Sequence, residues 1–372
     1  MIKGADISSL LEVEQNGGRF YDQGQEMPAP LILKRRGVNL IRLRLWNDPY
    51  DADGNPYGAG TNDLLRTMEL ARRCKALGLP WLLDFHFSDF WADPGKQHPP
   101  KAWANLDADG LAKAVYDFTC ETLTTLKQAD LLPVIVAVGN ELSNGLLWPW
   151  GKVPNWSNIA RFVSSGIRAV KAVAPSIKTM IHLDNGGCSD LYQSWFGSYR
   201  SSGGADFDLI GLSYYPFWHG TLADLQDDMT RLAGSLGKPM IVTETSMAFT
   251  REECNQLEGL RPEEKKGLAS NAKSASAVPW PSTPEGQAQF LRDLWAVIRS
   301  VPKGLCRGFI WWEPAWLPVK GSGWTTPAGL AYLHEAGPGG NEWANQALFD
   351  YDGRALPALT AIASLPLPEL QS

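Results

Sequence analysis

The sequence predicts an α/β fold, a single (β/α)₈ TIM barrel over residues 1–372 with extended loops after its second, third, seventh and eighth strands. Three observations predict this fold. Eight short apolar runs alternate with helical segments, the pattern of a parallel sheet. No linker or change of composition divides the chain. Polar and aromatic residues follow directly after the runs, as at the carboxyl end of a barrel, where active sites lie.

The expected strands are short and rich in Val, Ile and Leu, which is typical of buried parallel strands. In chain order they are Ile2–Ile7, Asn39–Leu45, Pro80–Phe85, Pro133–Val138, Lys178–Leu183, Leu209–Ser213, Pro239–Thr243 and Gly308–Trp312.

Helical spacing of apolar residues predicts helices around residues 64–74, 159–173 and 290–298. We expect Thr61 to cap the first helix and Gly78 to end it. The longest insertions should build the rim of the barrel. They are Asp51–Asn62, His86–Gly110, Thr245–Gln287 and Glu313–Leu356. Within the third of these, the charged run 261–266 is expected to be solvated helix surface.

Composition excludes several classes of protein. Of the 372 residues, 44% are hydrophobic and 20% are charged, which is too apolar for a disordered chain. Because 34 Lys and Arg face 40 Asp and Glu, the net charge is −6, and no basic surface for nucleic acid or an anionic membrane is expected. No apolar run reaches the roughly 18 residues of a membrane span.

The cysteines and tryptophans add two further indications. Five cysteines are widely spaced without a CxxC pair, so we expect neither a zinc site nor a disulfide framework. The sequence leaves undecided whether two of them form one disulfide at the surface. Sixteen tryptophans are an unusually large number, and exposed indoles are costly unless a flat apolar ligand covers them. Sugar rings are such ligands.

Two glutamates follow strands that face each other across a barrel. Glu141 comes after the fourth expected strand, next to Asn140, and Glu244 comes after the seventh. Two carboxylates aimed at one cleft are what glycoside hydrolysis requires, one as proton donor and one as nucleophile or stabiliser. The alternative for each glutamate is a salt bridge to a neighbour at a strand end.

Arg42 and Arg44 alternate along the second expected strand and therefore share a face. Inside a barrel each needs a buried anionic partner, and Glu244 is a candidate. An arginine beside Glu244 would keep that carboxylate charged. The alternative is an outward pair that covers helix surface.

Other polar and aromatic residues are expected at the barrel mouth. Asp84, His86, His182, Asp184 and Asn185 end the third and fifth strands, and aromatic runs follow the sixth and eighth. For each tryptophan, stacking on a sugar competes with plain loop packing. Glu313 is expected to be structural.

Several motifs resemble glycoside hydrolase family 53, the endo-β-1,4-galactanases. They run in order from Gly4 to Pro357 and include GADISSL from residue 4, IRLRLWNDP from 41, LDFHFSDFWADP from 83, VGNE from 138, SYYPF from 213 and WEPAW from 312. The tail NQALFD from residue 345 resembles the bacterial branch of the family.

This resemblance implies a retaining hydrolase in which Glu141 is the acid/base and Glu244 the nucleophile. It also implies a set of substrate-binding residues around the cleavage point and along the cleft: Arg42, Arg44, Asp84, His86, Trp91, Asn140, Asp184, Asn185, Tyr214, Trp312, Trp316 and Trp324. Among these, Trp91, Trp316 and Trp324 are the expected stacking residues further from the cleavage point.

We expect no cofactor and no metal. Bacterial relatives often bind calcium near the seventh and eighth loops, but the corresponding stretch, Glu252–Ser276, lacks a recognisable spacing of oxygen ligands. The expected partner is a β-1,4-galactan polysaccharide, with no nucleic acid and no membrane, and the expected state is a monomer. We expect a secreted or periplasmic protein whose leader is absent from this chain, with a cytoplasmic location left open.

Two alternatives stay open. Another β-1,4-endoglycanase, such as a mannanase, xylanase or cellulase, would share the two glutamates and differ in its sugar contacts. A sugar-binding barrel without catalysis would lack one glutamate or hold it away from the other.

Overall fold

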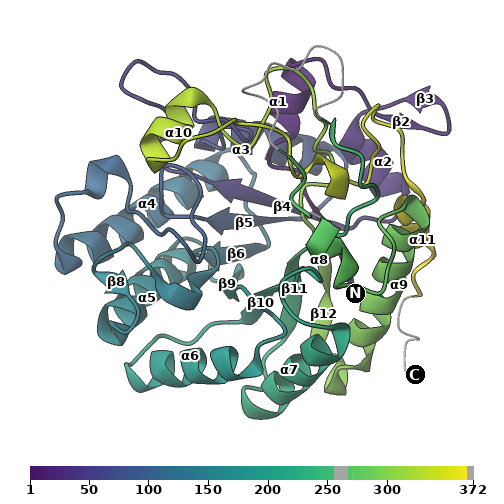
Figure 1. Ribbon diagram of the computed structural model, residues 1–372. Helices are drawn as coiled ribbons and strands as arrows, with labels where there is room; N and C mark the ends of the chain where they lie inside the picture. Colours follow the sequence, from purple (N-terminus) through teal and green to yellow (C-terminus); the bar gives the residue numbers. More distant parts are fainter. Residues whose placement is uncertain (255–266, 271, 367–372) are drawn as a thin grey trace.

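The computed structural model describes residues 1–254, 267–270 and 272–366, and a closed barrel of eight parallel strands forms its centre (Figure 1). Neighbouring strands follow one another in the chain and the last pairs with the first. They are β1 (Ile2–Asp6), β4 (Leu40–Leu45), β5 (Trp81–Phe85), β6 (Ile135–Val138), β9 (Lys178–Leu183), β10 (Leu209–Ser213), β11 (Met240–Thr245) and β12 (Cys306–Trp311). The predicted (β/α)₈ fold is confirmed, since each expected run forms a barrel strand.

Helices surround the barrel, and two short hairpins lie outside it (Figure 1). The helices are α1 (Leu10–Gln15), α2 (Ala29–Arg35), α3 (Leu64–Ala76), α4 (Ala108–Gln128), α5 (Trp156–Val173), α6 (Ser189–Ser201), α7 (Leu222–Ser235), α8 (Ala272–Ser276), α9 (Pro284–Ser300), α10 (Pro327–Leu333) and α11 (Pro357–Ser364). The hairpins pair β2 (Tyr21–Asp22) with β3 (Gln25–Glu26) and β7 (Gly145–Leu146) with β8 (Gly151–Lys152). Single 3₁₀ turns span Lys101–Trp103, Leu142–Asn144, Pro302–Gly304 and Ala344–Gln346.

The three helices predicted from spacing are α3, α5 and α9, but the predicted cap of α3 is wrong. Asp63, not Thr61, is the N-cap residue, and its carboxylate accepts a hydrogen bond from the backbone N–H of Arg66 at 2.8 Å. Thr61 has a φ of 47° and belongs to the preceding turn. An aspartate caps a helix at least as well as a threonine does. The helix therefore begins after Asp63, two residues later than the cap that the sequence predicted. Gly78 follows the C-cap Leu77 with a φ of 63° and ends the helix as expected.

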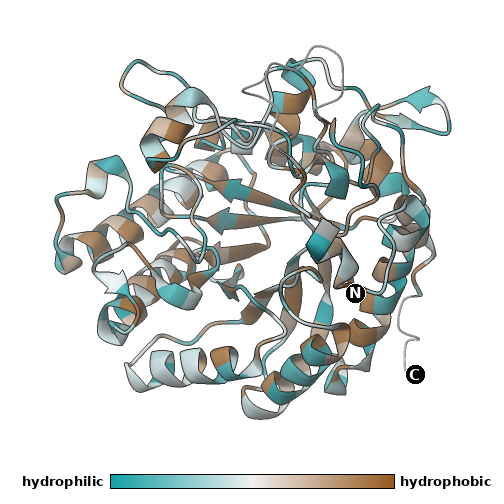
Figure 2. Cartoon of the chain, in the orientation of Figure 1, coloured by the Kyte–Doolittle hydropathy of each residue, from teal (hydrophilic) through white to brown (hydrophobic). Residues whose placement is uncertain are grey.

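The barrel has an apolar interior and an apolar outer layer. At its amino-terminal end the interior is filled by one residue set from successive strands: Leu40, Leu82, Ile135, Ala137, Met180, Leu209, Ile241 and Ile310. A larger cluster lies between the outer faces of the strands and the inner faces of the helices. Figure 2 shows the hydrophobic strands at the centre and helices whose hydrophilic residues lie on the periphery. Burial of both layers supports the rigid strands that carry the site.

A separate aromatic cluster lies on the side of the barrel mouth formed by the loops after β4, β5, β10 and β12. Its buried members are Trp46, Tyr57, Ala59, Phe90, Tyr215, Trp312, Trp316, Trp324 and Ala344. Rings within it pack edge to face, for example Trp46 on Phe90 with centroids 4.8 Å apart. The cluster therefore packs the long loops against one another, together with backbone hydrogen bonds such as that from Ala59 to Gly323.

All five cysteines lie among the described residues and none forms a disulfide. The surface disulfide that the sequence left open is therefore not formed in this structure. Within the described part of the chain, no helix has the length and apolar character that a membrane crossing requires.

Candidate active site

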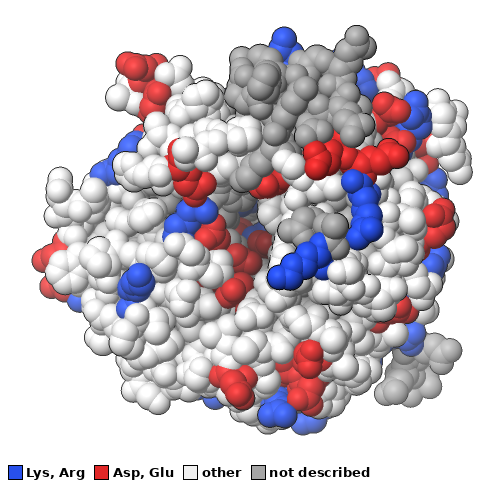
Figure 3. Space-filling model, in the orientation of Figure 1, with Lys and Arg blue, Asp and Glu red and all other residues white. Residues whose placement is uncertain are grey.

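A cavity of about 340 Å³ opens at the carboxyl ends of the barrel strands. Figure 3 shows a hollow on this face, with acidic side chains around it. The charged residues that line the cavity are Arg42, Arg44, Asp93, Lys96, Glu141, Asp184, Glu244, Glu335 and Glu342. Its aromatic lining consists of Trp91, Tyr215, Trp218, Trp312, Trp324 and Trp343. A site lined by charged groups and flat indole rings suits a ligand ring that has polar groups at its edge and apolar faces.

The rim differs from the expectation in two respects. The loops after β5 and β12 line the cavity as predicted, but the loop after β10 contributes as well, through Tyr215, Trp218 and His219. No residue of Asp51–Asn62 lines it; that loop supports the eighth loop from behind, where the N–H of Ala59 donates to the carbonyl of Gly323. Part of the loop after β11, residues 255–266 and 271, lies outside the described residues, and with it the charged run 261–266 that was expected to be helix surface.

Glu141 is aimed into the cavity by an unusual backbone turn after β6. Gly139 has a φ of 94° and Glu141 a φ of 50°, the left-handed region that costs energy for a residue with a side chain. A Cβ on Gly139 would lie 2.7 Å from Leu142 Cδ2, so glycine is required there. This turn brings the glutamate side chain back over the barrel mouth.

Glu244 lies within β11, one residue beyond the predicted end of the strand. The pairing of β11 changes register with β10 between Leu212 and Ser213, and with β12 between Val242 and Thr245. Such irregularities re-aim a side chain beside an active site. They direct Glu244 inward, and one of its carboxylate oxygens lies within 4.8 Å of one of those of Glu141.

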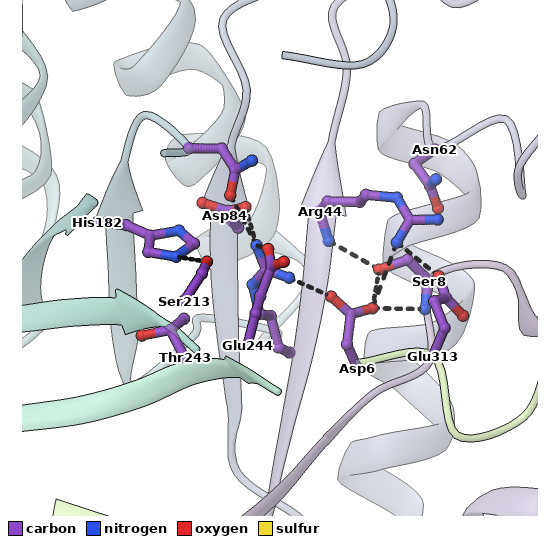
Figure 4. A network of polar contacts seen from close by, with 12 residues as sticks. Asp6, Ser8, Arg44, Asn62, Asp84, His182, Ser213, Thr243, Glu244 and Glu313 are labelled. Carbon is purple, nitrogen blue, oxygen red and sulfur yellow. Dashed lines mark hydrogen bonds and ion pairs between the residues drawn. The ribbon is translucent and has the colours of Figure 1, made fainter. Parts of the chain in front are cut away.

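Arg42 connects Glu244 to three other polar side chains. Its guanidinium lies 2.7 Å from Glu244, 2.7 Å from Asp6 and 2.6 Å from Asp84, and it donates to Asn140 Oδ1 at 2.9 Å. Figure 4 shows these carboxylates converging from β1, β5 and β11. The arginine is fully buried, and its pKa is raised well above the usual value, since the three carboxylates more than offset the effect of burial.

The two glutamates have different electrostatic surroundings. Burial, then the charges of Glu244 and Asp184, raise the pKa of Glu141 well above its usual value. Burial also raises the pKa of Glu244, but the Arg42 ion pair and a 2.8 Å hydrogen bond from the Tyr215 hydroxyl oppose the rise. A single proton shared by this pair therefore belongs on Glu141, while Glu244 stays charged.

Arg44 forms a second ion network beside the first (Figure 4) and lies against Trp46 and Trp312 of the aromatic cluster. Its guanidinium lies 2.5 Å from Glu313, which also accepts a hydrogen bond from the Ser9 hydroxyl at 2.5 Å. The guanidinium carbon lies 4.6 Å from the ring centre of Trp91, a cation–π distance. Burial raises the pKa of Glu313 to about 7. Glu313 does not line the cavity, in keeping with a structural role.

His86 and Asp184 both line the cavity, His86 after β5 and Asp184 after β9. His86 Nδ1 accepts hydrogen bonds from the Trp46 indole and the Ala92 backbone at 3.2 Å, and its Nε2 lies 3.3 Å from Asp84. Burial lowers the pKa of His86, so the ring stays neutral. Asp184 accepts a hydrogen bond from Ser143, and burial raises its pKa.

Four residues expected to bind substrate do not line the cavity. Tyr214 points away from it and donates its hydroxyl to the carbonyl of Gly220, so the neighbouring tyrosine faces Glu244 instead. Trp316 is 1% exposed, lies behind Trp312, and donates its indole N–H to Asn341. Two others are also absent from the lining: Asn185 lies in a left-handed turn and Asp84 lies beneath Arg42.

The cavity also contains residues that the sequence did not single out as substrate-binding. Tyr215 and Trp218 belong to the aromatic run after the sixth expected strand, and Trp343 lies in the eighth loop. The aromatic run was a signal for the first two, but not for which members face inward. Nothing local distinguishes Trp343 from the other loop tryptophans.

Within the described residues, Glu141, His182 and Glu244 bring ligand atoms within 4.8 Å of one another, close enough for a metal ion. Their contacts do not favour one. Both oxygens of Glu244 are already bonded, to Arg42 and Tyr215, and the guanidinium charge would repel a cation. Most of Glu252–Ser276, where calcium ligands would be sought, lies outside the described residues.

Comparison with known proteins agrees with the geometry of the site. The profile of glycosyl hydrolase family 53 matches residues 2–362. The family consists of glycosidases that act without a cofactor. The chain is 36% identical to the endo-β-1,4-galactanase of Bacillus subtilis (strain 168), over 96% of this chain and 84% of the relative.

Two further proteins are similar over nearly the whole chain. A protein of Niallia circulans, described as an uncharacterized protein in the bgaB 5′ region, is 40% identical over 97% of this chain and 93% of its own length. The solved structure of the Ignisphaera aggregans GH53 catalytic domain superposes with a TM-score of 0.88 at 39% identity, over 97% of this chain and 95% of that domain.

Proposed function

Since the chain belongs to glycosyl hydrolase family 53 and is therefore a glycoside hydrolase, we propose that it cleaves internal β-1,4-galactosidic bonds of galactan and type I arabinogalactan with retention of configuration. The substrate follows from the name of the Bacillus subtilis relative. The open cavity in Figure 3, walled by indoles and floored by carboxylates, suits a polysaccharide chain that passes across the surface.

One observation carries the mechanism: one carboxylate oxygen of Glu141 lies within 4.8 Å of one carboxylate oxygen of Glu244. Retaining glycosidases hold their two carboxyl groups about 5–5.5 Å apart, whereas inverting enzymes leave roughly 6.5–9.5 Å for a water molecule. The short separation supports a double displacement. It also counts against a sugar-binding barrel without catalysis, because that protein would not need the pair.

In the first step Glu141 protonates the glycosidic oxygen as Glu244 attacks the anomeric carbon, which breaks the C–O bond and forms a glycosyl ester on Glu244. Arg42 and Tyr215 hold both oxygens of Glu244 and keep it ionised before the attack. In the second step Glu141, now charged, takes a proton from water, and the water oxygen displaces Glu244 from the anomeric carbon.

The substrate-binding assignment is part of this proposal. Asn140 bonds Arg42 and the Ala92 carbonyl, so its amide is fixed beside the acid/base. Trp91 and Trp312 lie next to each other on one wall, with ring centres 6.2 Å apart, and offer apolar faces to a pyranose ring. Trp324 lines the same wall and accepts the Trp91 indole N–H on its backbone carbonyl at 2.9 Å.

We also propose a monomeric enzyme with one catalytic barrel that acts outside the cytoplasm. The charged and aromatic side chains that line the cavity come from the strand ends and loops of a single barrel, and a hydrophilic polysaccharide does not cross a lipid bilayer unaided. Light scattering on the purified protein tests the first point, since a dimer mass would contradict it. Fractionation of source cells tests the second, because activity confined to the cytoplasm would contradict it.

Product analysis on linear β-1,4-galactan, with β-1,4-linked glucan, mannan and xylan in parallel, tests the substrate. We expect galacto-oligosaccharides of intermediate length from galactan and none from the other polymers. Glu141→Gln and Glu244→Gln should remove nearly all activity, while Glu285→Gln, an exposed glutamate on α9, should not. Preferential cleavage of another polymer would select the alternative β-1,4-endoglycanase.

A further inference from the structure

Ser213 and His182 lie below the two glutamates and have no part in the steps described above. His182 is in β9 and Ser213 is the last residue of β10, and both are fully buried. His182 Nε2 lies 2.8 Å from Ser213 Oγ, and Figure 4 shows the ring and the hydroxyl pointing toward each other near Glu244. A ring nitrogen of His182 lies within 4.8 Å of a carboxylate oxygen of Glu141, and the neighbouring Ser213 hydroxyl acts on Glu141 as a hydrogen-bonding group that lowers its pKa.

We propose that His182 and Ser213 form a hydrogen-bond relay that stabilises the charged form of Glu141, which makes both of them positioning residues for the acid/base. This inference rests on the role proposed for Glu141. No proton passes along the relay and no bond is broken in it.

The relay assigns a direction to each hydrogen bond, because the Ser213 hydroxyl has one proton and the relay directs it to Glu141. Burial, then the charge of Arg42, lower the pKa of His182 to about 3, so the ring is neutral and carries one N–H. With that proton on Nε2, the ring donates to Ser213 Oγ. The single hydroxyl proton of Ser213 is then left for Glu141, and the bond it forms is stronger to the charged carboxylate than to the neutral acid.

The groups around Glu141 explain why it needs such a bond. Glu244 faces it from β11, Asp184 from the end of β9 and Asp93 from the loop after β5, and all three disfavour a second negative charge. The Tyr215 hydroxyl, from the end of β10, is committed to Glu244. Among the described residues no Lys or Arg forms an ion pair with Glu141. Yet the second step of a double displacement needs Glu141 charged.

The relay makes a specific prediction for the pH profile. Because the Ser213 hydroxyl lowers the pKa of Glu141, its removal in Ser213→Ala should raise that pKa and move the basic limb of kcat/KM to higher pH, by about one unit. The acidic limb, which reports Glu244, should stay in place. If Ser213 only filled space, its replacement would lower activity at every pH without moving the basic limb alone.

Two further variants complete the experiment. His182→Phe keeps a ring of similar size but removes the donor to Ser213, and should move the basic limb in the same direction by a smaller amount. Ser246→Ala removes another buried serine hydroxyl at the barrel mouth, one that bonds Gln346, and should leave both limbs unchanged. Thermal melting checks that each variant folds. If Ser213→Ala does not fold, the pH profile of His182→Phe tests the relay in its place.

The carboxyl ¹³C NMR titration of Glu141, assigned by comparison with Glu141→Gln, is a readout that does not depend on activity. A higher midpoint in Ser213→Ala than in the wild type supports the relay. Equal midpoints in wild type, Ser213→Ala and His182→Phe overturn it, even if the wild type hydrolyses galactan normally. A wild type that leaves galactan intact overturns the proposed function instead, and the titration still decides the relay.

Discussion

Arg42 Nη2 lies 2.7 Å from Oε1 of Glu244, and the two side chains are 1% and 8% exposed. The pair is not isolated, because Asp6 and Asp84 hold the same guanidinium from below. A charge network of this kind fixes the nucleophile in position and keeps it ionised, but it depends on one arginine.

Arg42→Lys should lower kcat by about 100-fold or more, since a lysine ammonium cannot bond Asp6, Asp84, Asn140 and Glu244 together. It should also lower the melting temperature, because buried carboxylates lose their partner. The matched control is Arg73→Lys, whose partly exposed side chain pairs with Glu14 and Glu69 far from the cavity. Equal kinetics in the two variants would show that Arg42 is dispensable.

Tyr215→Phe should move the acidic limb of kcat/KM to higher pH. The Tyr215 hydroxyl donates to Glu244 and favours its charged form, so removing it raises the pKa of Glu244, and activity is lost at a higher pH as the solution is acidified. The adjacent tyrosine is the control. Tyr214→Phe removes a hydroxyl that bonds the Gly220 carbonyl and should leave the profile unchanged. A shift in Tyr214→Phe alone would restore the original sequence prediction.

Trp324→Ala should lower kcat/KM on galactan by roughly tenfold, which corresponds to the loss of about 1.4 kcal/mol of binding free energy. Short aryl galactosides that do not reach the residue should be cleaved as before, because remote binding energy is used only by long substrates. Trp150→Ala is the control, since Trp150 is 44% exposed and lies outside the cavity. An equal loss on both substrates would assign Trp324 to loop packing.

Asp228→Asn should stabilise the protein above neutral pH. Asp228 on α7 is fully buried, and burial raises its pKa to about 7. The folded state therefore holds a proton that the unfolded state releases near pH 4, and wild-type stability falls as pH rises from about 4 to 7. The variant has no such group. The difference between its melting temperature and that of the wild type should therefore increase across this pH window and stay constant above it.

The adjacent exposed aspartate provides the control for that series. Asp227 pairs with Arg231 on the surface, and Asp227→Asn should change the melting temperature little at any pH. A difference between Asp228→Asn and wild type that stays constant from pH 4 to pH 8 would show that Asp228 does not carry the proton.

The sequence predicted the barrel because strand and helix periods are local properties. It also placed Glu141 and Glu244 at strand ends, and topology alone brings such ends to one face. It could not decide between Tyr214 and Tyr215, since the irregular pairing after Leu212 sets which of them faces inward. The cap of α3 was missed because Thr61 and Asp63 are both good caps, and only the backbone turn at Thr61 excludes it.

Loop tryptophans were the least predictable part of the site. Trp316 and Trp343 both lie in the eighth loop, but the first is buried behind Trp312 and the second lines the cavity. Their positions depend on contacts between loops that are distant in sequence, such as the bond from Trp316 to Asn341. No local pattern of residues reports those contacts.

The most direct test of the central claim is ¹H NMR of linear β-1,4-galactan during its first minutes of hydrolysis by the wild-type protein. A double displacement through Glu244 and Glu141 predicts that the reducing ends of the new oligosaccharides appear first as the β-anomer, and that the α-anomer grows in only by mutarotation. First appearance of the α-anomer would show inversion and contradict the account, and so would the absence of any new reducing ends.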